Sequence, residues 1–428
     1  MNRAEKLFWQ TANKLRYPAQ NNWGKRSLYD SVSFCNRCGA CTQACPIYRL
    51  NAVETDSPRG RNQAIRLIAE RKLKMTEPKL QQSFATCTLC GSCTQACAAH
   101  LPTAHYVLDV QRPLQARKLP FFLRTFLSLR GRKPRLFEKL TRAGLCLRPL
   151  WKMGSYLPGL GWLRLAAARI PSLPPSLKNA LNKAKLPTQS EKPKFIYLPS
   201  LEAEFLQPQI AISSLRLLSK QGPTTCWLNT ASGLFEFVYG DLSQSKRLLR
   251  RLIRKHRQTA QGTLPLVTDS LDVYHFLKQA AFLVAPHKKS VEQANRFAKC
   301  VRYITEFFPK KLEISTDVKP PIRLDRGTLF NRQSEPTEKT ISLFKTLFKK
   351  NFVECEYTDF DTPAFGYAFS THNQNERLML QVVKQTALKQ TKTLFTFSGL
   401  CALELNYALR RFYPAAEARH VVSITEEP

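Results

Sequence analysis

The stretch CNRCGACTQACP at residues 35–46 contains four cysteines at the spacing C-x₂-C-x₂-C-x₃-C. The stretch CTLCGSCTQACA at residues 87–98 repeats this spacing. Three thiolates on one tight loop can cap three irons of a cubane [4Fe–4S] cluster, and a glycine lets the backbone curl around it. Gly39 and Gly91 stand at the matching position of the two runs. The two stretches therefore predict two [4Fe–4S] clusters.

The fourth cysteine of each run is expected to ligate the cluster of the other run. In two-cluster ferredoxins this cysteine lies at a helix start and points away from its own loop. The first cluster would take Cys35, Cys38, Cys41 and Cys97, and the second would take Cys87, Cys90, Cys93 and Cys45. Pro46 follows the first run as the pattern expects, whereas Ala98 replaces the proline after the second.

Two other interpretations of these cysteines remain open, namely structural zinc and buried free thiols. Zinc sites often pair two C-x₂-C motifs across a longer stretch, and four cysteines in so short a run, twice, fit that poorly. The chain has 13 cysteines, an odd number, with eight of them within residues 35–97. This clustering favours metal ligands in a reducing compartment over a disulfide framework.

A helix is predicted between the two cysteine runs. Ser57 is a suitable N-cap and Pro58 suits the first helical position. A helix here indicates a helical dicluster domain and not a small βαβ ferredoxin. The cations Arg59, Arg61 and Arg66 have two interpretations. They compensate cluster charge, or they form a solvated helix face, which we favour for any single arginine.

The two cysteine runs, together with SPRGR at residues 57–61, resemble the iron–sulfur subunit of glycolate oxidase and its relatives over residues 30–112. Those relatives include the corresponding parts of D-lactate and anaerobic glycerol-3-phosphate dehydrogenases. The resemblance implies an electron-transfer subunit that passes electrons from a flavoprotein partner toward a quinone or another acceptor. The partner would oxidise a 2-hydroxy acid such as glycolate or lactate. We expect no catalytic residue and no flavin or nicotinamide site in this chain.

The resemblance also implies that the C-terminal half holds two cysteine-rich repeats, each with a Cys-Cys-Gly motif. Here the repeats are degenerate, because non-cysteine residues fill the expected ligand positions. These residues are Leu201, Ala231, Ser232, Gly327, Thr362, Pro363, Ala364 and Ser398. Cys401 remains, and its role is open. We expect Cys146, Cys226, Cys300 and Cys355 to be buried as small hydrophobic residues.

The expected fold class is mixed, with an α-helical dicluster ferredoxin domain followed by two α/β repeat units. The domains are predicted at residues 1–112 (dicluster), 113–190 (basic amphipathic connector), 191–315 (repeat 1) and 316–428 (repeat 2). Strands are expected in KFIYLPS, LPLVTDS, PIRLD and KTLFTFS. Helices are expected at 211–220, 242–258, 377–389 and 401–412.

The charge of the chain is strongly basic, with 66 Lys and Arg against 31 Asp and Glu and a formal net charge of +35. Between Arg112 and Leu186 the only acid is Glu138, and aromatic residues accompany the cations. This connector could lie on an anionic membrane, contact a partner subunit or pack on the chain's own domains. Nucleic acid is a weaker alternative, because no recognised nucleic-acid module is present.

No segment has the length and apolarity of a membrane span, and residues 1–20 lack a signal-peptide core. We therefore expect a cytoplasmic protein, with the inner face of the membrane as a peripheral contact. Two rival functions remain. One is a binding or scaffold module whose clusters are structural. The other is a thiol or disulfide reductase, which the missing C-terminal cysteines disfavour.

Overall fold

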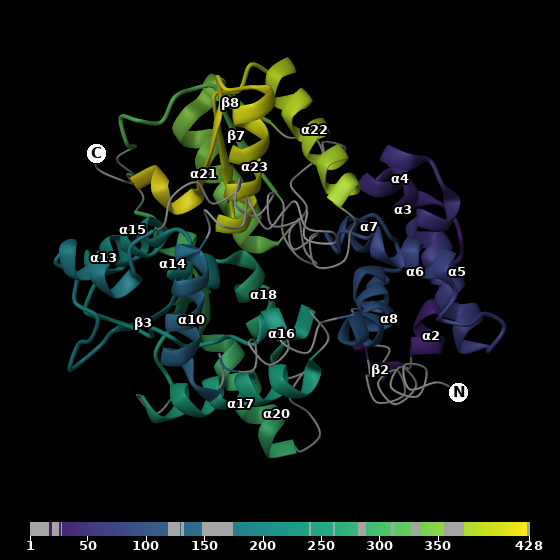
Figure 1. Cartoon of the computed structure of the whole chain (residues 1–428), viewed down its shortest axis with the longest axis horizontal. Coiled ribbons are helices and arrows are strands. Elements are labelled where there is room, and N and C mark those ends of the chain that lie inside the picture. The colour runs from purple at the N-terminus through teal and green to yellow at the C-terminus, as the bar shows by residue number, and fades with distance from the viewer. Residues whose placement is uncertain are drawn as a thin grey trace.

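The structure is a computed structural model (Figure 1). It describes residues 17–18, 25–26, 28–118, 129, 132–147, 174–238, 241–259, 262–280, 288–309, 312, 314–326, 334–354 and 372–425. Gly327, Cys355, Thr362, Pro363 and Ala364 lie outside these ranges, as does much of the predicted connector.

The N-terminal part is built from short helices, as the sequence predicts. A two-stranded antiparallel pair precedes them, formed by β1 (Tyr17–Pro18) and β2 (Lys25–Arg26). The helices are α2 (Leu28–Ser33), α3 (Ala40–Gln43), α4 (Pro46–Asn51), η1 (Glu54–Asp56), α5 (Pro58–Ala69), α6 (Pro78–Ala85), α7 (Ser92–Gln95) and α8 (Thr103–Lys118). α8 continues across residue 112, where the domain boundary was predicted.

Helix α5 begins where the sequence predicts. The Ser57 hydroxyl accepts a hydrogen bond from the Gly60 backbone N–H at 2.9 Å, and Pro58 occupies the first helical position. Ile65 and Ile68 are buried on its inner face. The N-cap and the apolar face together fix the direction of the segment that joins the two cysteine runs.

The first α/β unit follows α10 (Pro134–Cys146) and α13 (Leu177–Lys183). Its strands are β3 (Phe195–Leu198), β4 (Thr224–Cys226), β5 (Leu266–Thr268) and β6 (Val301–Tyr303). Its helices are α14 (Leu201–Phe205), α15 (Pro208–Ser219), α16 (Leu234–Val238), α17 (Leu242–Gln258), α18 (Leu271–Lys278), α20 (Lys288–Cys300) and η2 (Ile304–Phe307). All four residues of β3 are buried, as in a parallel sheet covered on both faces.

The second α/β unit repeats this plan. Its strands are β7 (Ile322–Asp325), β8 (Phe352–Val353), β9 (Thr393–Thr396) and β10 (Glu417–His420). Its helices are α21 (Glu335–Phe348), η3 (Lys349–Asn351), α22 (His372–Leu388), α23 (Gly399–Phe412) and η5 (Val421–Thr425). The four expected strands and four expected helices of the C-terminal half are present, with shifted boundaries for most of them.

The two sheets have one topology. The strand order is β4-β3-β5-β6 in the first and β8-β7-β9-β10 in the second, and every pairing within them is parallel. In both, the first strand of the unit pairs with the second and third, and the third pairs with the fourth. The mixed fold class is confirmed.

The three parts share their hydrophobic cores. One core runs from the dicluster helices into the first α/β unit, and a second joins the two α/β units. A third packs Cys45 and Ile47 of the dicluster part against α22 and α23. Figure 1 shows α22 reaching from the second unit toward α3 and α4. Within the described residues, no helix is long and apolar enough to cross a membrane.

Candidate metal centre

The two cysteine runs adopt the same backbone conformation. Gly39 and Gly91 have φ values of 86° and 77°, and each is the N-cap residue of a short helix, α3 and α7. This left-handed conformation is costly for residues with a Cβ. A Cβ on Gly39 would also meet the Arg59 guanidinium at 3.1 Å. The glycines therefore allow each loop to turn back so that its cysteines face one centre.

Three of the four thiols of the first predicted set, those of Cys35, Cys41 and Cys97, lie near one another. Burial above all, with smaller contributions from Cys35, Cys97 and Cys45, raises the pKa of Cys41 to about 12. Cys97 is far from Cys41 in the sequence and belongs to the second run. Its proximity to Cys41 is what a crossed set of ligands requires.

The second predicted set is also brought together. Burial raises the pKa of Cys87 to about 11, with contributions from Cys45 and Cys90. The pKa of Cys93 lies well above its usual value, because of burial and then of Cys90, Cys87 and Cys45. Cys45, from the first run, therefore lies among the thiols of the second.

The donor chemistry fits an iron–sulfur cluster. Several thiolates in a buried space repel one another, and bound cationic metal is what offsets this repulsion. Cys45, Cys87, Cys90 and Cys93 line one pocket together with Arg61. In the described residues, no three His, Cys, Asp or Glu side chains are placed to hold a single metal ion.

The two sets differ in their access to solvent. Cys38, in the first set, is exposed. Cys45, in the second set, is buried and packs with Ile47 against the second α/β unit. The other six cysteines of the two sets are partly exposed. The first set therefore contains the exposed thiol of the eight, and the second contains the fully buried one.

Arg61 is buried beside the second set, with 2% of its surface exposed. Its guanidinium donates to the Ser83 carbonyl at 3.1 Å and to the Thr86 hydroxyl. Its charge also lowers the pKa of Cys45 and Cys87, against the larger effect of burial. The solvated-face interpretation is wrong for this arginine, because its side chain points into the domain.

The other two arginines of α5 are more exposed. Arg59 pairs with Glu54 at 2.6 Å, and Arg66 pairs with Glu70 at 2.8 Å. Helical periodicity alone does not separate these three cations. The signal that could have found Arg61 is its place beside Asn62 and Ile65, which share its buried face.

Three expectations about individual cysteines need correction. Cys45 is the N-cap residue of α4, as predicted for a fourth cysteine, but no helix starts at Cys97. There the chain turns, with the His100 N–H donating to the Cys97 carbonyl at 2.8 Å, and α8 starts after Pro102. Cys146 is exposed at the end of α10 and Cys300 is only partly buried, so neither is a buried small hydrophobe. Cys226 is buried as expected, and Cys401, whose role was left open, is buried as well.

Residues 31–101 match the family model of the 4Fe-4S dicluster domain. All eight clustered cysteines lie within the matched residues, and the predicted [4Fe–4S] cofactors are confirmed.

The chain is 28% identical over 225 residues to the glycolate oxidase iron-sulfur subunit of Escherichia coli (strain K12). The match covers 50% of this chain and 49% of that protein, so the chain spans about half the length of the curated relative it matches. The resemblance to this family is confirmed. No solved structure matches the chain.

Proposed function

We propose that this chain is the electron-transfer subunit of a flavin-dependent 2-hydroxy acid dehydrogenase. The observation that supports the proposal is that the two cysteine runs come together, with Cys97 near Cys41 and Cys45 near Cys87 and Cys93. When bound, two cubane clusters supply two neighbouring one-electron centres. The exposed Cys38 in one set and the buried Cys45 in the other suit a relay, because electrons can enter at one edge and pass inward.

In this proposal the eight cysteines act only as ligands, in the crossed sets assigned from the sequence. The exposed Cys38 marks the edge at which a redox partner would approach. Phe34, which is 47% exposed, directly precedes Cys35, and Tyr29 on α2 is also exposed. Exposed aromatic side chains are common in protein interfaces. The partner would be a flavoprotein on the cytoplasmic side, with glycolate or lactate as its substrate and a quinone or another molecule as final acceptor.

The two α/β units would serve as a scaffold for the dicluster domain. Their common strand order supports the interpretation of two degenerate repeats at residues 191–315 and 316–428. Cys226 ends β4 and Cys401 lies in α23, so these thiols come from different units. With about four thiolates needed per cluster, the described part of these units offers no ligand set. Replacing Cys401 with serine should leave the iron content of the full chain unchanged.

The test is redox titration of anaerobically purified protein, followed by electron paramagnetic resonance. We expect about eight irons per chain and two reversible one-electron signals. Cys38→Ser and Cys97→Ser should change the same signal, and Cys45→Ser should change the other. Cys146→Ser, which alters an exposed thiol outside both runs, is the matched control and should change neither.

Two outcomes would reject the proposal. Colourless protein that contains zinc would show that no iron–sulfur clusters are bound, so the proposed relay would have no redox centres. Two clusters that stay silent across accessible potentials would point instead to structural clusters and a binding or scaffold role. Isolation of the native complex should recover a flavin-containing subunit, and its absence would leave the clusters without the proposed electron donor.

A further inference from the structure

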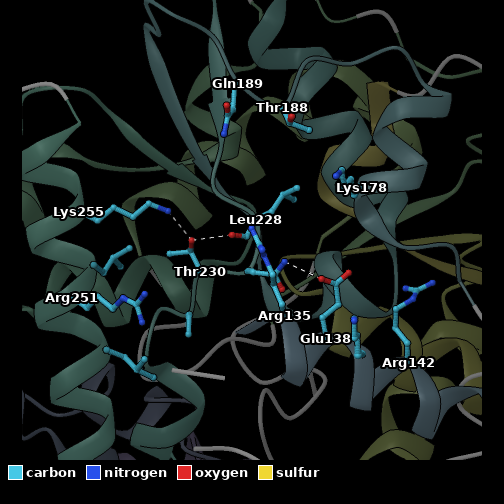
Figure 2. A pocket seen from close by; sticks show the side chains of 15 residues that line it. Arg135, Glu138, Arg142, Lys178, Thr188, Gln189, Leu228, Thr230, Arg251 and Lys255 are labelled. Atoms are coloured by element: carbon cyan, nitrogen blue, oxygen red, sulfur yellow. Dashed lines mark hydrogen bonds between the residues drawn. The ribbon is translucent and has the colours of Figure 1, made fainter. Parts of the chain in front are cut away.

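A large cleft lies between the described part of the basic connector and the first α/β unit, and none of the eight clustered cysteines is among its lining residues. Its volume is about 910 Å³. Three helices contribute side chains, namely α10, α13 and α17, and the loop after β4 forms its floor with Leu228, Asn229 and Thr230. Figure 2 shows Arg251 and Lys255 on one side of this loop and Arg142 and Lys178 on the other.

The charge of the cleft is strongly unbalanced. Its lining includes one carboxylate, Glu138, whose Oε2 accepts a hydrogen bond from the Asn229 side-chain amide at 3.0 Å. Six cations also line the cleft: Arg135, Lys139, Arg142, Lys178, Arg251 and Lys255. Cations that converge on one concavity repel one another, and a concave wall keeps water from screening them fully. An anion in the cleft would relieve this repulsion.

Lys255 shows the effect of that environment on one group. Its ammonium donates to the Thr230 hydroxyl at 3.0 Å and lies 4.3 Å from the centre of the Trp227 ring. Burial and, to a smaller extent, the nearby Arg251 lower the pKa of Lys255 to about 8, against the opposite effects of Cys226 and Glu204. The ammonium thus has a hydroxyl, an aromatic face and the Arg251 cation as neighbours.

We propose that this cleft binds a small polyanion that has several phosphate or carboxylate groups. The volume falls in the range of small-molecule sites, which is about 300–1,000 Å³. Guanidinium groups bind both kinds of oxyanion through paired hydrogen bonds. The cations come from helices on opposite sides of a concavity, whereas a flat membrane surface would be met by cations on one face. This inference does not depend on the proposed electron-transfer function.

The test measures binding of pyrophosphate and of citrate to the full-length protein by calorimetry, at low and at moderate salt. The variant Lys178→Gln with Arg251→Gln removes one exposed cation from each side of the cleft. Its matched control is Lys183→Gln with Arg254→Gln, which removes exposed cations from the same two helices, α13 and α17, outside the cleft. We expect the cleft variant to weaken binding by about tenfold or more and the control by less than about twofold.

A second measurement reports on the cleft directly. Pyrophosphate should slow the acylation of Lys255 by an amine-directed reagent, and it should leave the acylation of Lys183 unchanged. Binding of pyrophosphate alone, or of citrate alone, would identify which oxyanion the cleft prefers. Equal loss in both variants would overturn the proposal in favour of diffuse attraction. Binding to phosphatidylglycerol vesicles with no binding of either small anion would overturn it in favour of a membrane contact.

Discussion

At the scale of single residues, Arg61 lies beside the more buried set of cysteines, where its charge stabilises the ionised thiols of Cys45 and Cys87. A reduced cluster has one more negative charge than an oxidised one, so a neighbouring cation favours reduction. We predict that Arg61→Gln lowers the potential of one of two centres in a redox titration. Arg66→Gln is the control, since Arg66 lies on the same helix and pairs with Glu70. A shift of equal size in both variants would contradict this role for Arg61.

The cysteines of the site could be predicted from the sequence because their spacing is itself the chemical requirement. Arg61 could not be singled out, since it is one of three arginines within eight residues of α5. Its position became clear only when the Ser83 carbonyl and the Thr86 hydroxyl, from another helix and its end, were placed beside it. The exposure of Cys146 could not be predicted either, because a cysteine is tolerated on both the buried and the exposed face of an amphipathic helix.

At the scale of elements, the start of α23 packs closely against the first α/β unit. A Cβ on Gly399 would lie 2.7 Å from Cγ of Glu202 and 2.8 Å from Cδ1 of Ile210. Those atoms belong to α14 and α15, so a methyl group would push the two units apart. We predict that Gly399→Ala destabilises the protein by about 1–3 kcal/mol, measured by denaturant unfolding.

The matched control is Gly144→Ala in α10, where nothing lies within 4 Å of the added Cβ. Alanine has a higher helix propensity than glycine, so this variant should gain about 0.5–1 kcal/mol. A loss of stability in both variants would show that the close contact at Gly399 is not the cause.

The strands and helices that the sequence predicted are the ones with a strong local pattern. The helix α17 begins and ends where expected, because Asp241 caps it and Leu249, Leu252, Ile253 and His256 form its buried face. In the α/β units, the strands β4, β6, β8 and β10 were missed. They have two to four residues each, and their pairing depends on neighbouring strands far away in the sequence.

At the scale of the whole molecule, the packing of the dicluster domain on both α/β units could not be predicted from the sequence. The His105 ring and the Gln279 amide lie 3.3 Å apart and join α8 to the end of α18. On the other side, Arg377 of α22 donates to the Asn51 side chain at 3.1 Å. These contacts link residues 174 and 326 positions apart. These contacts form because the dicluster domain shares hydrophobic cores with the α/β units, and no local sequence motif indicates them.

The junction between the two α/β units contains a buried carboxyl group, Glu202, that accepts a hydrogen bond from the Ser398 hydroxyl at 3.3 Å. Burial and, to a smaller extent, the neighbouring Asp269 and Asp272 raise its pKa from the usual 4.5 to about 7. Below pH 4.5 the group is protonated in both the folded and the unfolded chain. As the pH rises to 7, the unfolded chain loses this proton first, so the group progressively lowers the free energy of unfolding.

We therefore predict that Glu202→Gln becomes more stable relative to the unchanged protein as the pH rises from about 4.5 to 7. The relative gain should reach about 3 kcal/mol, since one pKa unit corresponds to 1.36 kcal/mol. The buried His275 and His420, whose pKa values are lowered to about 4, have the opposite effect over the same range. Because these histidines are present in both proteins, their contribution cancels in the difference. Denaturant unfolding at several pH values measures the difference in free energy of unfolding between the variant and the unchanged protein. The control is Glu191→Gln, which alters an exposed carboxyl, and its difference should not change with pH. A difference that stays constant with pH would mean that Glu202 keeps an ordinary pKa at this junction.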